Sequence, residues 1–295
     1  MADNIGNKAA HDYHLDVPVA QEGFYVKGNT HCDWGMKNRL SRMFDPKSGN
    51  TVMLAFDHGY IMGATAGLER MDVTIAPLCR YADVLMATRG AIRSCIPPTV
   101  HNAICLRATH DASVLIDDMS TGNGVGADME AAIRMNASAV AIQCFIGGAG
   151  EARSLETLCR AVDAGERYGI PVLGVTAVGK EMARTTQYFL LAARMLAELG
   201  ASFVKTYYCD DFEKVVAACP VPIVIAGGKK LPEDEALTMA YRAISDGARG
   251  VDMGRNIFQS EHPAAMCRAV AKIVHEKFTD REAFQFYQEL AAQDN

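Results

Sequence analysis

The sequence lacks the features of a membrane protein and of a nucleic-acid-binding protein. No run of about eighteen apolar residues occurs in its 295 residues, so we expect no membrane-spanning helix. The N-terminus has no basic start followed by an apolar stretch, so we expect no signal peptide. Asp and Glu total 35 against 29 Lys and Arg, and no basic cluster is visible. Nucleic acid is therefore not an expected partner, whereas a small anion needs only one local cradle.

The nine cysteines also lack the spacing of a disulfide framework or a structural zinc site. Their number is odd and no CxxC pair occurs, so we expect reduced thiols in the cytoplasm. A catalytic zinc site needs about three convergent ligands, and only His58 follows a predicted strand, so no metal is expected. Cys144 ends another predicted strand and is interpreted as a buried structural thiol.

From residue 51 onward, short apolar runs alternate with segments of helical period. Each run is almost continuously apolar, as is typical of parallel strands that are covered on both faces. Eight such units predict an α/β fold, a (β/α)8 TIM barrel. A doubly wound open sheet has the same local pattern, but the count of eight and the lack of a Rossmann fingerprint favour the barrel. The expected strands are residues 52–56, 83–87, 113–116, 138–144, 171–176, 202–206, 222–226 and 250–253.

We expect the chain to divide into a polar N-terminal arm (1–30), the barrel (31–278) and one additional C-terminal helix (279–295). A capping box from Thr279 to Glu282 begins this helix, and apolar residues recur along one side of it. The barrel is complete without this helix. We therefore expect its apolar stripe to dock on the barrel or on a neighbouring subunit.

Lys205 lies inside the apolar run of the sixth predicted strand. Alternation places Phe203, Lys205 and Tyr207 on one face of that strand. If this face lines the barrel, burial lowers the pKa of the lysine, and a neutral amine can form Schiff bases with ketones. The alternative is a lysine that faces outward and extends between helices.

Asp57 follows the first predicted strand and shares the phase of Met53 and Ala55. In a TIM barrel, the carboxyl ends of the strands converge on the active site. A carboxylate at this position could bind a substrate hydroxyl, pair with Lys205 or move protons. The alternative is a loop aspartate that caps the next helix.

Glycine loops follow the seventh and eighth predicted strands. They contain Gly227 and Gly228 in the first loop and Gly254 and Arg255 in the second, and residues 255–259 can form a short helix. Glycines let backbone N–H groups approach an anion, and this pair of loops is the recurrent phosphate site of barrels. We therefore expect a phosphate site here, with ordinary turns as the alternative.

Together these motifs resemble the class I aldolases of the archaeal-type fructose-bisphosphate aldolase group. The resemblance implies that Lys205 is the Schiff-base lysine, that Asp57 handles substrate hydroxyls, and that the two glycine loops with Arg255 hold phosphate. It also implies a metal-independent, cytoplasmic homo-oligomer built from rings of five, often stacked as decamers. The resemblance runs from about residue 24 to the C-terminus, and the motifs that carry it are residues 33–36, 39–42, 54–60, 205–208, 220–232 and 250–259.

One departure separates this chain from the sugar-bisphosphate aldolases of the group. Those enzymes carry an acid–base tyrosine at the end of the fifth strand, and residues 175–180 here contain none. The closer resemblance is to the thiolases of the group, which act in autoinducer-2 catabolism. It implies acetyl transfer from a phosphorylated 2,4-diketone to coenzyme A as co-substrate, with no bound cofactor, giving dihydroxyacetone phosphate and acetyl-CoA. In the expected scheme, Lys205 attacks the C2 ketone and the thiol attacks C4, while Thr176, Lys180 or a water could replace the tyrosine.

Two alternatives stay open at this point. The first is a class I aldolase that cleaves a phosphorylated or sulfonated ketose, such as fructose 1,6-bisphosphate, without coenzyme A. The second is a non-catalytic barrel that binds a sugar phosphate. Turnover of any candidate substrate would exclude the second alternative, and a requirement for coenzyme A would exclude the first.

Overall fold

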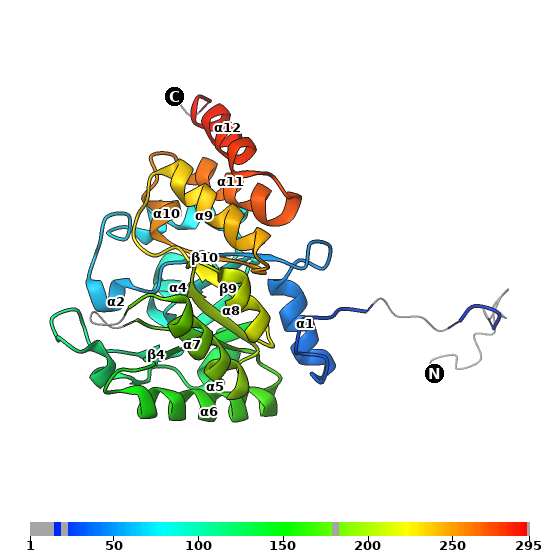
Figure 1. Ribbon diagram of the computed structural model, residues 1–295, viewed down its shortest axis with the longest axis vertical. Coiled ribbons are helices and arrows are strands. Elements are labelled where there is room, and N and C mark those ends of the chain that lie inside the picture. The colour runs from blue at the N-terminus through cyan, green and yellow to red at the C-terminus, as the bar shows by residue number, and fades with distance from the viewer. Residues whose placement is uncertain (1–14, 19–22, 179–182, 294–295) are drawn as a thin grey trace, which may run out of the picture.

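A computed structural model describes residues 15–18, 23–178 and 183–293. Eight parallel strands form a closed barrel in the order β1-β10-β9-β8-β7-β6-β3-β2, with helices around it (Figure 1). The expected TIM barrel is therefore confirmed. Its strands are β1 (Thr51–Ala55), β2 (Val84–Ala87), β3 (Ala103–Arg107), β6 (Ala139–Cys144), β7 (Val172–Thr176), β8 (Phe203–Tyr207), β9 (Ile223–Ala226) and β10 (Gly250–Met253).

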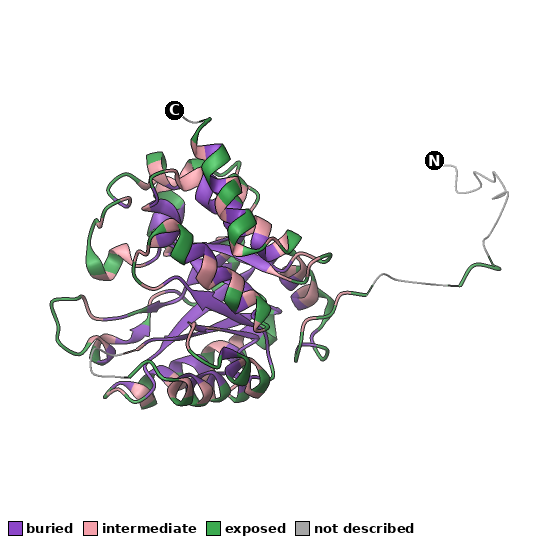
Figure 2. Ribbon diagram, turned by 45° about the horizontal axis from the view of Figure 1, so that its top comes forward, coloured by how far each residue is buried: buried purple, intermediate pink, exposed green. Residues whose placement is uncertain are grey.

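The helices cover the outer face of the barrel, and their exposed sides point to solvent (Figure 2). Several of them begin at a side-chain cap, such as the Thr185 hydroxyl that accepts from the Tyr188 N–H ahead of α7. The helices are α1 (Trp34–Met43), α2 (Gly59–Met62), α3 (Met71–Thr74), η1 (Ala76–Tyr81), α4 (Arg89–Cys95), η2 (Met119–Gly122), α5 (Met129–Arg134), α6 (Glu151–Tyr168), α7 (Thr186–Glu198), α8 (Phe212–Ala218), α9 (Glu233–Ser245), α10 (Arg255–Phe258), α11 (Pro263–Glu276) and α12 (Asp280–Ala291).

The strands are apolar on both faces because they separate two hydrophobic clusters. One cluster fills the barrel interior, and the other lies between the barrel and its helices. Helix α1 supplies Leu40, Met43 and the following Phe44 to the interior cluster, and the Phe44 ring packs edge-on against Phe203 at 5.5 Å. This plug fills the amino end of the barrel, so the opposite end is left for a pocket.

The third strand was predicted in the wrong place. It is β3, whereas residues 113–116 form a surface loop in which Leu115 is 88% exposed. The loop lies within a long connection that also contains a small antiparallel hairpin, β4 (Thr109–His110) and β5 (Gly124–Val125). His110 therefore follows the third strand instead of preceding it. An apolar run in a crossover loop has the same local pattern as a strand, and only the barrel closure separates the two cases.

The C-terminal helix α12 begins at the predicted capping box, in which Thr279 and Glu282 exchange hydrogen bonds. Its Ala283, Tyr287 and Leu290 are buried against the barrel's outer helices, chiefly α11 and α9. Figure 1 shows α12 beside α11, at the end of the chain. The apolar stripe therefore docks on the barrel of the same chain. Among the described residues, no helix is long and apolar enough to cross a membrane.

Candidate active site

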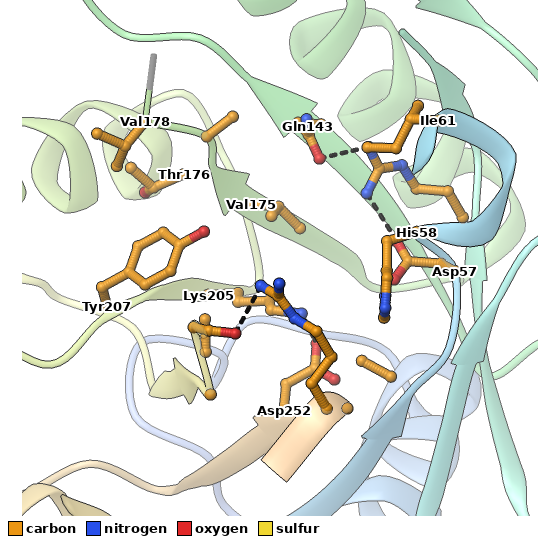
Figure 3. Close-up of a pocket in the computed structure, with 18 of the residues that line it drawn as sticks. Asp57, His58, Ile61, Gln143, Val175, Thr176, Val178, Lys205, Tyr207 and Asp252 are labelled. Carbon is orange, nitrogen blue, oxygen red and sulfur yellow. Dashed lines mark hydrogen bonds and ion pairs between the residues drawn. The ribbon is translucent and has the colours of Figure 1, made fainter. Parts of the chain in front are cut away.

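A pocket of about 280 Å³ opens at the carboxyl ends of the strands (Figure 3). Side chains from seven of the eight strand ends or the loops that follow them reach it, as expected for a TIM barrel. The pocket brings together the six residues that the sequence predicted for catalysis and phosphate binding. These are Lys205, Asp57, Gly227, Gly228, Gly254 and Arg255.

Lys205 points into the barrel, which confirms the predicted strand phase. Phe203, on the same face of β8, belongs to the interior cluster, and Tyr207 lines the pocket above the lysine. The Lys205 side chain is 12% exposed, and its Nζ lies 2.8 Å from Oδ2 of Asp252. The lysine therefore reaches the floor of the pocket, and its ammonium is part of a buried ion pair.

The expected downward shift of the Lys205 pKa is wrong in sign, although burial itself acts in the expected direction. Desolvation lowers this pKa, but the carboxylates of Asp252 and Asp57 together raise it above its ordinary value. The amine is therefore protonated in the resting site. Strand periodicity locates the lysine correctly, but it does not reveal the acidic partner that reverses the pKa shift.

Asp252 is a site residue that the sequence analysis did not single out. It lies in the middle of β10, and its side chain is completely buried. Burial raises the pKa of Asp252, which outweighs the opposing effect of Lys205. The available signal was a single charged residue inside an apolar run, the same signal that identified Lys205.

Asp57 forms the second buried ion pair of the pocket. Its Oδ2 lies 2.8 Å from Nη1 of Arg107, which ends β3, and both side chains are at least nine-tenths buried. Burial raises the pKa of Asp57, but Arg107, with help from Lys205, lowers it more, so the net shift is downward. Asp57 is therefore a stable carboxylate at the pocket wall. The alternative interpretation, a helix-capping aspartate, is not supported, because α2 has no side-chain cap.

Arg107 holds this wall together through five side chains. It donates to Asp111 at 2.6 Å, to the Tyr60 hydroxyl at 3.0 Å, to Thr109 at 3.1 Å and to Gln143. The Tyr60 hydroxyl in turn donates to Asp111 at 2.6 Å. Sequence reasoning missed Arg107 because it missed the strand that carries it. A correct third strand would have placed this arginine at a strand end, where barrel active sites gather their polar groups.

The two glycine loops meet as predicted. Gly228 has a φ of +68°, and a side chain on Gly254 would meet the carbonyl of Ala55 at 2.2 Å. Nη2 of Arg255 donates to the carbonyl of Gly228 at 2.6 Å, so the guanidinium bridges the loops. Helix α10 begins at Arg255, as expected for residues 255–259. The loops and this guanidinium together form a concave, cationic corner of the pocket.

The opposite wall carries no tyrosine at the end of β7. Thr176, Ala177 and Val178 line it, and Lys180 lies outside the described residues. The tyrosines that line the pocket come from other elements. Tyr60 belongs to α2, and Tyr207 lies two residues after Lys205, with the Arg184 guanidinium 4.3 Å from its ring centre.

The remaining candidate residues do not form a metal or thiol centre. Within residues 15–18, 23–178 and 183–293, no group of three or more His, Cys, Asp or Glu is arranged to hold a metal ion. His58 stacks on Phe258, and burial lowers its pKa. Cys144 is fully buried, and burial raises the pKa of its thiol, which fits a structural role.

Comparison with known proteins gives a consistent result. The sequence pattern of the DeoC/LacD family aldolases matches residues 51–260. A 3-hydroxy-5-phosphonooxypentane-2,4-dione thiolase of Enterobacter sp. (strain 638) is 55% identical over 290 residues, which cover 98% of each chain. A protein of the same name from Klebsiella pneumoniae is 54% identical, again over 98% of each chain. A solved archaeal fructose 1,6-bisphosphate aldolase is 26% identical, with a TM-score of 0.72 over 82% of this chain and 99% of that one. This chain belongs to the DeoC/LacD aldolase family.

Proposed function

We propose that the protein is a Schiff-base thiolase that transfers an acetyl group from 3-hydroxy-5-phosphonooxypentane-2,4-dione to coenzyme A. The observation that carries this proposal is Lys205. Its amine lies in the barrel-mouth pocket of a chain 55% identical, over 98% of its length, to a thiolase of that name. The products are acetyl-CoA and dihydroxyacetone phosphate, and the reaction belongs to autoinducer-2 catabolism.

Atom balance decides which carbonyl the lysine attacks. The acetyl group contains C1 and C2, and the dihydroxyacetone phosphate contains C3 to C5. Lys205 therefore forms its iminium at C4, and the thiolate attacks C2, which reverses the expected assignment. The C2–C3 bond breaks, and its electron pair enters the C3–C4 enamine on Lys205. Protonation at C3 and hydrolysis of the iminium then release dihydroxyacetone phosphate.

The cationic corner takes the phosphate in this proposal. C4 and the phosphate-bearing C5 are adjacent, so a ketone at Lys205 carries its phosphate group within reach of the pocket wall. Gly227, Gly228 and Gly254 leave room for the phosphate oxygens, and Arg255 supplies the charge. Asp57, fixed by Arg107, accepts a hydrogen bond from the C3 hydroxyl.

Coenzyme A enters the proposal as co-substrate, because a thiolase needs a thiol acceptor. We also propose a cytoplasmic homo-oligomer of five-membered rings or decamers, which the family resemblance supports. The stripe on α12 does not supply the contact surface, because it is buried within the chain. The exposed aromatic side chains of Tyr25 and Trp34, beside the amino end of the barrel, are better candidates.

A class I aldolase is the second candidate function. It is favoured by Tyr60 and Tyr207, whose positions in the pocket offer acid–base hydroxyls without a tyrosine on β7. This candidate predicts cleavage of a phosphorylated ketose in the absence of coenzyme A.

One experiment separates the two functions. The purified protein is given the phosphorylated dione with and without coenzyme A, and acetyl-CoA and dihydroxyacetone phosphate are measured by mass spectrometry. The thiolase forms both products only with coenzyme A, and Lys205→Ala forms neither. Absence of acetyl-CoA from a folded wild-type protein would remove the thiolase proposal. Fructose 1,6-bisphosphate cleavage in the same preparation would then support the aldolase.

A further inference from the structure

The floor of the pocket holds a lysine and an aspartate with few other partners. Asp252 comes from β10 and Lys205 from β8, with β9 between them in the barrel. Oδ2 of Asp252 lies 2.8 Å from the ammonium nitrogen and forms an ion pair with it. Both carboxylate oxygens are buried, and neither has a hydrogen-bond partner of good geometry among the described residues. Asp252 therefore contacts a cation that can release a proton, and its second oxygen is free to receive one.

The other carboxylate near Lys205 is not available in this way. Asp57 accepts a hydrogen bond from Arg107, and an arginine cannot be deprotonated in a protein. A proton on Asp57 would leave the buried guanidinium with one carboxylate fewer. The protonated Lys205 must lose a proton before it can attack a ketone. Asp252 is the carboxylate in contact with its ammonium, so it is the group placed to take that proton.

We propose that Asp252 is the acid–base catalyst of Schiff-base formation, carrying the protons of the Lys205 ammonium to the water that leaves. The role deepens the proposed function and rests on it. It also supplies, for this half of the reaction, the proton transfer that the family assigns to a tyrosine on the fifth strand.

The steps balance with these two residues and the ketone alone. Asp252 takes one proton from the ammonium, and the neutral amine forms the N–C bond while the carbonyl electron pair moves to oxygen. The acid protonates this oxygen and takes a second proton from the nitrogen, which gives a carbinolamine. It then protonates the hydroxyl, the C–O bond breaks, and water leaves as the nitrogen lone pair forms the iminium. Asp252 ends as the carboxylate beside the iminium cation.

The net charge of the buried site stays constant through these steps. The positive charge begins on the ammonium and ends on the iminium nitrogen, and the aspartate is neutral only in between. Moving a proton over 2.8 Å within an ion pair avoids the cost of bringing an unpaired charge into a dry pocket. Oδ1 provides a second position from which the carboxyl group can reach the oxygen of the bound ketone.

The test measures iminium formation alone, without coenzyme A or the dione. Dihydroxyacetone phosphate is mixed with enzyme, and borohydride traps the iminium at timed intervals before intact-mass analysis. We expect Asp252→Asn to slow trapping by at least about 100-fold at neutral pH, because acid–base groups contribute on the order of 10²–10⁴ in rate. The matched control is Asp246→Asn, which removes an aspartate that lies outside the pocket and accepts a hydrogen bond from the Tyr208 hydroxyl, and it should trap the iminium at the wild-type rate.

A second variant guards against a folding defect. Asp252→Ala opens space for a small acid, and added formate should accelerate its trapping at least about 10-fold if a missing proton carrier is the cause. Trapping by Asp252→Asn at the wild-type rate would overturn the role, as would a folded Asp252→Ala protein that formate does not accelerate. A wild-type protein that traps but makes no acetyl-CoA loses the thiolase function and leaves this result intact. A wild-type protein that never traps overturns both.

Discussion

The pocket contains two buried ion pairs that look alike and differ in one respect. Asp57 faces Arg107, and Asp252 faces Lys205, each at 2.8 Å. The pKa of Asp57 is shifted downward, whereas that of Asp252 is shifted upward. The arginine cannot release its proton and has four further acceptor side chains around it, whereas the lysine can.

This difference separates a fixed wall from a reactive floor. The Arg107 network orients Asp57, and removing any member leaves a buried polar group unpaired. The Lys205 pair can become neutral by moving one proton within itself. The same element of protein chemistry, a buried carboxylate beside a cation, therefore serves for positioning in one case and for reaction in the other.

The largest effect is expected on turnover, when Lys205 is replaced by a residue that keeps the positive charge but is not a nucleophile. Lys205→Arg retains a cation beside Asp252 and cannot form a Schiff base, so the rate of acetyl-CoA formation should fall more than about 10³-fold. The thermal midpoint should change little. Residual turnover within 10-fold of wild type would contradict Schiff-base chemistry at this residue.

Removing the cation of the Arg107–Asp57 pair should lower the free energy of unfolding more than removing the cation of the Lys205–Asp252 pair. Arg107→Met leaves Asp57 and Asp111 buried without their partner, which should lower the free energy of unfolding by about 3–5 kcal/mol. Lys205→Met should cost less, because Asp252 can take up a proton and become neutral. Urea unfolding at neutral pH measures both variants. Equal losses would mean that the two pairs are energetically equivalent.

Arg255 is a third cation of the pocket, and it belongs to neither ion pair, so it extends the comparison. Arg255 donates to a backbone carbonyl, and the proposal gives it the substrate phosphate. Arg255→Ala should raise KM for the phosphorylated dione about 10- to 100-fold, the equivalent of one charge-assisted hydrogen bond. Steady-state kinetics with phosphorylated and dephosphorylated dione check this. An equal KM increase for both substrates would contradict a phosphate-specific role.

The smallest effect is on the pH dependence of stability, where the two aspartates should act in opposite directions. The depressed pKa of Asp57 gives stability that is present above the pKa of the unfolded chain, about 3.9, and is lost as pH falls through the folded value. The raised pKa of Asp252 has the reverse effect, because stability falls as pH rises from about 3.9 through its folded value.

Two asparagine variants separate these contributions. Asp57→Asn should flatten the loss of stability on acidification below about pH 4, and Asp252→Asn should remove a decline above that pH. Each slope should change by less than about 1.4 kcal/mol per pH unit, the limit for one proton. Urea unfolding across pH 3 to 7 gives the slopes, and changes of the same sign in both variants would contradict the assignment.

Local sequence signals were sufficient for part of this site. Lys205 and the glycine loops lie in or directly after strands with clear apolar runs, and the structure places them in the pocket. Alternation put Lys205 on one face with Phe203 and Tyr207, but it left open whether that face lines the barrel. The eight-unit count likewise gave the barrel. The resemblance to class I aldolases added roles to residues that the pattern had already located.

The rest of the site depends on which strands meet, and a sequence pattern does not contain that information. Arg107 was missed because an apolar loop at 113–116 was taken for its strand. Asp252 carried the same local signal as Lys205, a charged residue inside an apolar run, but its pairing with a lysine two strands away around the barrel is not visible in the sequence. The sign of the Lys205 pKa shift follows from that pairing, so it could not be predicted from burial alone.

The most direct test of ketone chemistry at Lys205 is to map the trapped adduct. Wild-type protein is incubated with dihydroxyacetone phosphate and borohydride, digested, and sequenced by tandem mass spectrometry. We expect one reduced adduct per chain, on the peptide that contains Lys205, and none in Lys205→Arg. An adduct on another lysine, or none in protein shown to be folded, would contradict a Schiff base at the floor of this pocket.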